Sequence, residues 1–114
     1  MTMRLPADEQ KYTEAKAAGD LKPIHQEPAI QDFEYWRIVD NRFPHTRISD
    51  VDHLLVLKRE AAIADVTAAE WSELLSLYSR LDGEYDVITH NFASMRSVQS
   101  IPHFHLYKLK VGYK

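Results

Sequence analysis

The segment SIPHFHLY, residues 100–107, carries polar and apolar rings in alternation after its proline. Side chains of a β-strand point to opposite faces in turn, so His103, His105 and Tyr107 are expected on one face. Burying an imidazole or a phenol without a hydrogen-bonding partner costs about 1–3 kcal/mol. Three polar rings on one face of an otherwise apolar strand therefore indicate a functional site. Two partly exposed histidines on a solvated sheet face are the simpler alternative.

Three further stretches with the composition of strands lie upstream of this segment. They are EYWRIVD at 34–40, HLLVLKR at 53–59 and YDVITHNF at 85–92. The unbroken apolar run in the second stretch predicts burial on both faces or a central place in a sheet. Pro44 excludes the loop NRFPHTRISDVD, which joins the first two stretches, from a central strand.

The strongest helix signal covers residues 67–82. Thr67 and Glu70 have the spacing of a capping box, and Gly83 suits the position after a helix C-terminus. Apolar residues recur at helical spacing, which predicts one buried face. They are Trp71, Leu74, Leu75, Tyr78 and Leu81. Residues 6–19 predict a shorter, weakly apolar helix, either peripheral or in contact with a partner subunit.

Strands that come in pairs around one long helix predict an α+β domain with a mainly antiparallel sheet of about five strands. The 114 residues suffice for one compact domain. Residues 1–32 are assigned to the N-terminal helix and a connector that contains Pro23 and Pro28, and residues 33–114 to the sheet domain.

The composition narrows the class of protein. The chain has no cysteine, which removes disulfides and thiolate chemistry and fits a reducing compartment. No run approaches the roughly 20 apolar residues that span a bilayer, and Asp8 and Glu9 do not suit a signal peptide. The net charge of −3 argues against broad nucleic-acid binding. We expect a cytoplasmic protein without membrane or specific nucleic-acid partners, in which a compact site for an anionic small molecule stays possible.

SIPHFHLY resembles the active strand of the histidine triad superfamily. IVDNRFP, DHLLVLKR and YDVITHN resemble that family's other motifs and stand in the expected order. The resemblance covers residues 33–110 and implies a histidine-triad-like fold and a homodimer. It also implies hydrolysis or nucleotidyl transfer at the α-phosphate of a nucleotide conjugate, such as a dinucleoside polyphosphate or nucleoside phosphoramidate, with no metal or cofactor.

The resemblance assigns catalytic roles to His105, His103, His53 and Ser100, and to Tyr107 at the third position of the strand. His105 would be the nucleophile that forms a covalent nucleotidyl-histidine, because neutral imidazole attacks phosphorus well near pH 7. His103 would hydrogen-bond the backbone, and His53 would orient the cluster from the neighbouring strand. Ser100 would contact the phosphate or the leaving group, although a simple turn hydroxyl is the alternative. The assignment requires His103 and His105 to share a face and to lie close to His53 and Ser100.

Five positions are expected to bind the nucleotide. Asn41 matches a ribose-contacting position, and Phe43 would help to wall the base pocket, with a turn residue and a core residue as the alternatives. Asn91 would face the phosphate at the end of its strand. Gln99 is assigned to the same site, and Arg96 would supply positive charge in a loop that lacks the glycines found in relatives.

Tyr107 departs from the family, which has histidine at this third position. Its hydroxyl can donate to a phosphate oxygen, but it cannot carry a proton at neutral pH as imidazolium does. The alternative function is therefore a catalytically degenerate relative that binds nucleotide without turnover or serves as an interaction protein. A third interpretation takes His53, His103 and His105 as zinc ligands. The remaining histidines are expected at the surface: His25, His45 and His90.

Overall fold

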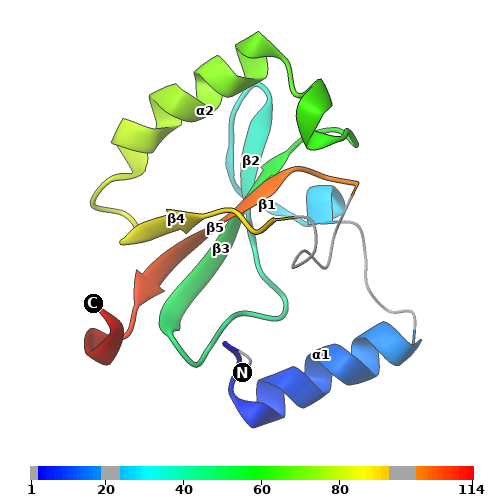
Figure 1. Cartoon of the computed structure of the whole chain (residues 1–114), viewed down its shortest axis with the longest axis vertical. Helices are drawn as coiled ribbons and strands as arrows, with labels where there is room; N and C mark the ends of the chain where they lie inside the picture. The colour runs from blue at the N-terminus through cyan, green and yellow to red at the C-terminus, as the bar shows by residue number, and fades with distance from the viewer. Residues whose placement is uncertain (1–2, 19–23, 93–99) are drawn as a thin grey trace.

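The computed structural model describes residues 3–18, 24–92 and 100–114. Within them, five antiparallel strands form one sheet in the order β1-β2-β3-β5-β4 (Figure 1). The strands are β1 Ala29–Asp32, β2 Trp36–Asp40, β3 Ser49–Leu57, β4 Val87–Thr89 and β5 His103–Leu109. The helices are α1 Pro6–Ala18 and α2 Ala68–Leu81. The expected α+β class with a five-stranded antiparallel sheet is confirmed.

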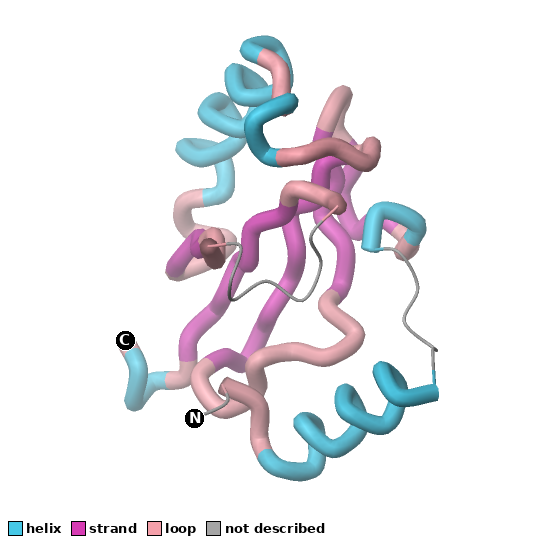
Figure 2. Tube along the Cα trace, turned by 45° about the vertical axis from the view of Figure 1, so that its right-hand side comes forward, coloured by secondary structure: helices cyan, strands magenta, loops and turns pink. Residues whose placement is uncertain are grey.

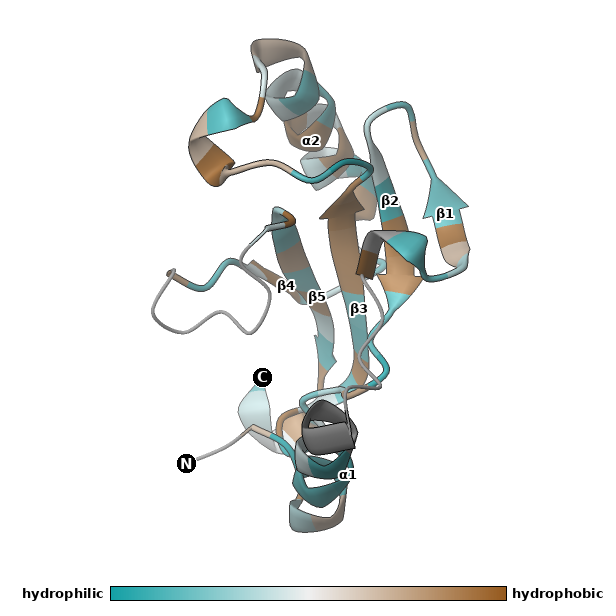
Figure 3. Cartoon of the chain, turned by 90° about the vertical axis from the view of Figure 1, so that its right-hand side faces the viewer, coloured by the Kyte–Doolittle hydropathy of each residue, from teal (hydrophilic) through white to brown (hydrophobic). Residues whose placement is uncertain are grey.

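The central position of the apolar stretch is also confirmed. β3 lies between β2 and β5, and its residues 54–57 are all buried. The strand begins at Ser49, earlier than the predicted residue 53, so its first half is polar and its second half apolar (Figure 3). The apolar half builds the core and the polar half brings functional groups to β5.

The sheet extends further at its N-terminal edge than the sequence indicates. β1 lies within residues 1–32, which the sequence assigns to the N-terminal helix and connector, and it pairs with β2, so the boundary at residue 33 falls inside a hairpin. At the other edge β4 covers only Val87–Thr89 of the predicted stretch 85–92. Short edge strands expose few unpaired backbone groups to other chains.

One face of the sheet, which we call the helix face, packs against α2 (Figure 2). Trp36, Ile38, Leu55, Leu57 and Leu106 of the sheet meet Leu74, Leu77 and Leu81 of the helix. Leu75 and Tyr78, which were predicted for the buried face, are instead 68% and 60% exposed. The spacing Leu74, Leu77, Leu81 is itself helical, and it places the apolar stripe about 100° away from Leu75.

Trp36 is fully buried in this core, and Trp71, the other tryptophan of the chain, packs against it half-buried. The Trp36 ring is 6.1 Å from the Trp71 ring and 5.9 Å from the Phe104 ring, and its indole nitrogen donates to the Glu70 carbonyl at 2.8 Å. Glu70 also completes the predicted capping box with Thr67. Gly83 follows the helix with a φ of 91°, a conformation that favours glycine.

The opposite face, which we call the loop face, carries Val39, Leu54 and Val56 and is packed by Ile101 and Ile24. The loop from residue 41 to 48 contacts this face through His45, whose ring stacks on His105. Helix α1, largely hydrophilic, stands beyond the start of β3 and apart from the sheet (Figures 1 and 3). None of the described helices has the length and apolar character required to cross a membrane.

Candidate active site

β5 presents its three polar rings on the loop face, as its alternation predicts. The His105 ring lies 5.8 Å from the His103 ring and 5.5 Å from the Tyr107 ring. His103 and His105 are each 8% exposed and Tyr107 is 2% exposed. The alternative of partly exposed histidines on a solvated sheet face is therefore wrong. Buried polar rings require partners, and each of the three has one.

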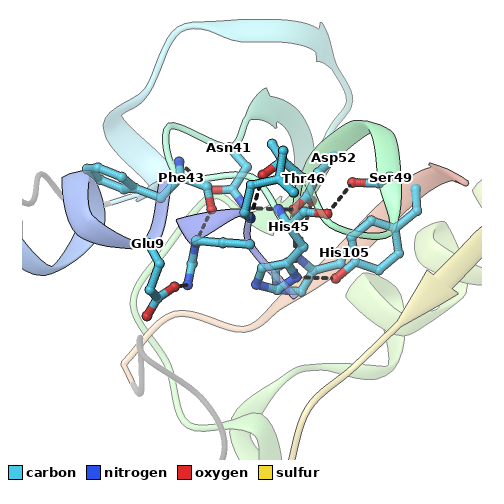
Figure 4. Close-up of polar contacts among 11 residues, drawn as sticks. Glu9, Asn41, Phe43, His45, Thr46, Ser49, Asp52 and His105 are labelled. Atoms are coloured by element: carbon cyan, nitrogen blue, oxygen red, sulfur yellow. Dashed lines mark hydrogen bonds and ion pairs between the residues drawn. The ribbon is translucent and has the colours of Figure 1, made fainter. Parts of the chain in front are cut away.

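The partner of His105 is Asp52, a buried carboxylate that sequence reasoning missed. In the sheet register Asp52 lies opposite Tyr107 and therefore on the loop face. Nδ1–H of His105 donates to Oδ1 of Asp52 at 3.2 Å (Figure 4). A neutral imidazole that carries its proton on Nδ1 has its lone pair on Nε2. Among the described residues none bonds to that Nε2, so it is the nitrogen that remains for chemistry.

The second oxygen of Asp52 is bound from the loop. Oδ2 accepts hydrogen bonds from Nδ2 of Asn41 and from the backbone N–H of His45, both at 2.9 Å. The Asp52 side chain has no exposed surface. A buried carboxylate is tolerated only when its oxygens are hydrogen-bonded, and three donors meet that demand. The same contacts fix the direction in which Asp52 presents Oδ1 to His105.

His45, expected at the surface, is buried in the site. Its ring stacks on the His105 ring, with centroids 4.8 Å apart and planes 22° apart. The chain turns back at this point, because the His45 carbonyl accepts hydrogen bonds from the backbone N–H groups of Ile48 and Ser49 and from the Ser49 hydroxyl. This turn places His45 over the loop face, against the His105 ring.

The hydroxyl of Tyr107 is hydrogen-bonded to His45. The Tyr107 oxygen lies 2.6 Å from Nδ1 of His45. Burial, reinforced by the nearby His105, lowers the pKa of His45 to about 4 against the opposing effect of Asp52, so its ring is neutral at pH 7. Burial and the Asp52 carboxylate raise the pKa of Tyr107, so the phenol keeps its proton. Tyr107 is therefore the donor and Nδ1 of His45 the acceptor.

His103 makes the backbone contact expected of it. Nδ1–H donates to the carbonyl of Ile101 at 2.9 Å. Because a carbonyl can only accept, the proton of this imidazole is assigned to Nδ1. His103 thus ties the start of β5 to the turn before it and forms the edge of the row of rings.

His53 is not part of this cluster, and the expectation that it lies beside His103 and His105 is wrong. In the register His53 faces Leu106, which belongs to the helix-face core. Its Nδ1 lies 2.6 Å from the hydroxyl of Tyr85. Adjacent residues of a strand face opposite sides, so β3 can bring only one of Asp52 and His53 to the loop face. The zinc interpretation that combined His53 with the β5 histidines fails for the same reason.

The other described residues that the sequence assigns to the site make no hydrogen bond or ring contact with His105. Both ends of the Asn41 amide are hydrogen-bonded within the protein. Oδ1 accepts from the Phe43 N–H in the loop, and Nδ2 donates to Asp52 on β3. The Phe43 ring lies beneath the Arg42 guanidinium at 5.3 Å. Ser100 is exposed and Asn91 half-buried, and no hydrogen bond joins either to His105 among the described residues.

Four positions complete the comparison with the sequence-based expectations. Arg96 and Gln99 lie outside the described residues, as does the side chain of His25. His90 is exposed, as expected, and its ring packs 4.7 Å from that of Phe104.

The N-terminal segment holds the loop that carries His45. The Leu5 N–H donates to the Thr46 hydroxyl at 3.0 Å, and that hydroxyl donates to Asp8 at 2.7 Å. Arg4 reaches the carbonyl of Phe43 at 2.7 Å. These contacts lie outside the sheet and tie the start of α1 to the site from within the same chain.

Among the described residues, His45, Asp52 and His105 are the group whose donor atoms approach metal-ligand spacing, all within 4.8 Å of one another. An imidazole binds a metal in its ring plane at about 2.0–2.1 Å. The two rings are stacked, so their lone pairs do not converge on one point, and Nδ1 of each ring already has a hydrogen-bonding partner. The arrangement suits an oriented imidazole better than a metal centre.

A cavity of about 390 Å³ lies on the helix face, between the end of α2 and β4. Tyr78, Tyr85 and Leu106 line it, together with Asp82 and Asp86. It is separated from His105 by the sheet. We therefore assign the candidate active site to the loop face, from the chemistry of its side chains.

Comparisons with protein-family models, with curated proteins and with solved structures find no match to this chain. The interpretation of the site therefore depends on its own geometry.

Proposed function

We propose that this chain is a hydrolase or nucleotidyl transferase that acts at the α-phosphate of a nucleotide conjugate through a covalent intermediate on His105. The observation that carries the proposal is the hydrogen bond from Nδ1 of His105 to the buried carboxylate of Asp52. A carboxylate in this position selects one imidazole tautomer and stabilises the imidazolium that forms during reaction. It thereby prepares Nε2 as a nucleophile.

The proposed reaction has two steps. Nε2 of His105 attacks the α-phosphorus, a bond to phosphorus forms, and the bond to the leaving group breaks with its electron pair. The ring becomes cationic, keeps its Nδ1 proton and goes on donating it to the Asp52 carboxylate, which offsets the new charge at close range. Water, or another acceptor, then attacks the phosphorus and gives up its proton to solvent. The bond between phosphorus and Nε2 breaks, its electron pair returns to Nε2, and the nucleotide leaves.

The sequence resemblance supports this proposal only in part. His103 and His105 share a face, and His103 bonds the backbone, as the histidine triad pattern requires. His53 lies on the opposite face, so the requirement that it lie close to the β5 histidines is not met. The proposal depends instead on Asp52, which takes the orienting role that the resemblance gave to His53. We include in the proposal a histidine-triad-like fold, a nucleotide ligand, a homodimer and, from the absence of cysteine, a cytoplasmic location.

A single-turnover experiment tests the proposal. Dinucleoside polyphosphates and nucleoside phosphoramidates, with adenine and guanine bases and labelled at the α-phosphate, are mixed with excess protein and quenched. Label is expected on His105 and is lost in His105→Asn. The matched control is His53→Asn, since its imidazole lies on the opposite face and should leave labelling intact. Absence of label and of turnover with every conjugate would contradict the proposal.

A specific observation favours a second candidate, nucleotide binding without turnover. The hydroxyl of Tyr107 is bound to His45 and is not available to a phosphate oxygen. Calorimetry with adenine and guanine nucleotides separates the candidates: binding without hydrolysis supports the second, and absence of binding leaves only an interaction protein.

A further inference from the structure

The third polar position of β5 raises a question that the proposed reaction leaves open, namely what Tyr107 does there. Tyr107 is 2% exposed, and its hydroxyl lies 2.6 Å from Nδ1 of His45. A group so enclosed does not contact a ligand. The Tyr107 ring stacks directly on the His105 ring, with planes 16° apart, and its hydroxyl acts on the site through His45.

His45 meets His105 face to face. The centroids of the two rings are 4.8 Å apart, closer than the 5.5 Å between His105 and Tyr107. The loop fixes His45 by its backbone N–H on Asp52, so one carboxylate organises both imidazoles. Rotation of the His105 ring away from Asp52 would therefore disrupt the stack with His45 as well as the hydrogen bond.

The proton carried by His45 is also defined. Tyr107 donates to Nδ1, so the single N–H of the neutral ring is on Nε2. Burial favours this neutral state. A neutral ring beside His105 does not oppose the positive charge that His105 gains on attack, whereas a protonated ring at this distance would repel it. Asp52, His105, Arg4 and Glu9 are the other charged or titratable groups that act on His45.

We propose that His45 and Tyr107 act as one hydrogen-bonded unit that positions the His105 ring for attack, with His45 as the positioning residue and Tyr107 as its support. This inference rests on the proposed function. It assigns the third imidazole of the site to the loop between β2 and β3 instead of to β5. On this inference Tyr107 supports catalysis, and its presence in place of histidine does not mark a loss of activity.

The variants follow from two contacts, the stack of His45 on His105 and the hydrogen bond from Tyr107 to His45. His45→Gln removes the stacked ring, and Tyr107→Phe removes only the hydroxyl. Both are expected to lower kcat by about 10- to 100-fold, because misplacing a reacting group by about 1 Å costs that much. The Kd for a nucleoside monophosphate should change less than about twofold, since ground-state binding is separate from orientation. The double variant should lose no more than the worse single variant.

The controls come from the pair on the helix face. His53→Gln and Tyr85→Phe break an equivalent hydrogen bond at 2.6 Å and should leave kcat unchanged. Tyr107→His should also stay below wild type, because a histidine side chain ends short of the phenol oxygen and cannot reach His45. Thermal melting identifies any variant that has lost its fold.

Nitrogen-15 NMR of the histidine rings gives a second readout that requires no turnover. Wild-type His105 should show the single tautomer with its proton on Nδ1, and Tyr107→Phe should convert it to a mixture. Unchanged kcat in both single variants, or a gain in Tyr107→His, would overturn the inference. If the wild type has no turnover, the proposed function has failed, and the inference is decided by the spectrum: an unaltered His105 tautomer in Tyr107→Phe overturns it.

Discussion

Two histidine–tyrosine pairs lie on opposite faces of the same sheet. In each, a tyrosine hydroxyl is 2.6 Å from Nδ1 of a histidine: His45 with Tyr107 on the loop face, and His53 with Tyr85 on the helix face. Only the loop-face pair has a second imidazole stacked on it and a carboxylate behind that imidazole. The hydrogen bond is common to both pairs, so the neighbours decide which one belongs to a reactive site.

Removing the Asp52 carboxylate takes away the feature that distinguishes the loop face, and it has the largest expected effect on kcat. In Asp52→Asn the amide no longer imposes the Nδ1–H tautomer on His105, and kcat should fall by about 10²- to 10⁴-fold. Steady-state kinetics on the conjugate that labels His105 measures this. Asp50→Asn, an exposed acid on the same strand, is the matched control and should be silent. Equal rates in the two variants would contradict the assignment of Asp52.

The loop-face pair should also give stability a pH dependence. The pKa of His45 is lowered from 6.5 to about 4, chiefly by burial. Between these values the unfolded chain binds a proton that the folded chain does not, so stability is full above pH 6.5 and falls as the pH falls toward 4. The slope is at most about 1.4 kcal/mol per pH unit. Denaturant unfolding should show a shallower slope in His45→Gln, and parallel curves would contradict this.

A third difference is that the N-terminal segment holds the loop-face pair in place. Thr46→Val keeps the shape of the side chain but removes both its bond to Leu5 and its bond to Asp8. We expect a loss of about 1–2 kcal/mol in the free energy of unfolding. The kinetic effect should be smaller than that of Asp52→Asn. Thermal melting and kcat measured on the same preparation test both statements.

The smallest effect is expected on the helix face. Burial raises the pKa of Tyr85 to about 12, so the phenol is protonated and donates to His53. Tyr85→Phe should cost about 1 kcal/mol of stability and leave catalysis unchanged. A large fall in kcat would show that the two faces are coupled through the sheet and that the comparison between them fails.

Local patterns in the sequence predict much of this fold. Alternation in residues 103–107 gives the two faces of β5, and the apolar run in residues 54–57 gives the central strand. The capping box at Thr67 predicts the start of α2. Each of these features depends on neighbours in the chain, and for that reason each can be read from the sequence.

The site depends on contacts between distant segments and was predicted only in part. Asp52 and His53 are adjacent, and a shift of one residue in the register of β3 against β5 would exchange their faces. The sequence does not encode that register in a pattern that can be read locally. His45 is harder still, because its burial results from the turn at Ser49 and from the N-terminal contacts, which join residues far apart in the chain.

The aromatic packing behind β5 has a practical consequence. Phe104 stands between His103 and His105 in the strand, and its ring contacts both Trp36 and Trp71, which are the two tryptophans of the chain. All indole fluorescence thus originates from a cluster that touches the reverse side of the reactive strand. A ligand that displaces β5 should alter the emission of the unlabelled protein, which gives a direct optical titration.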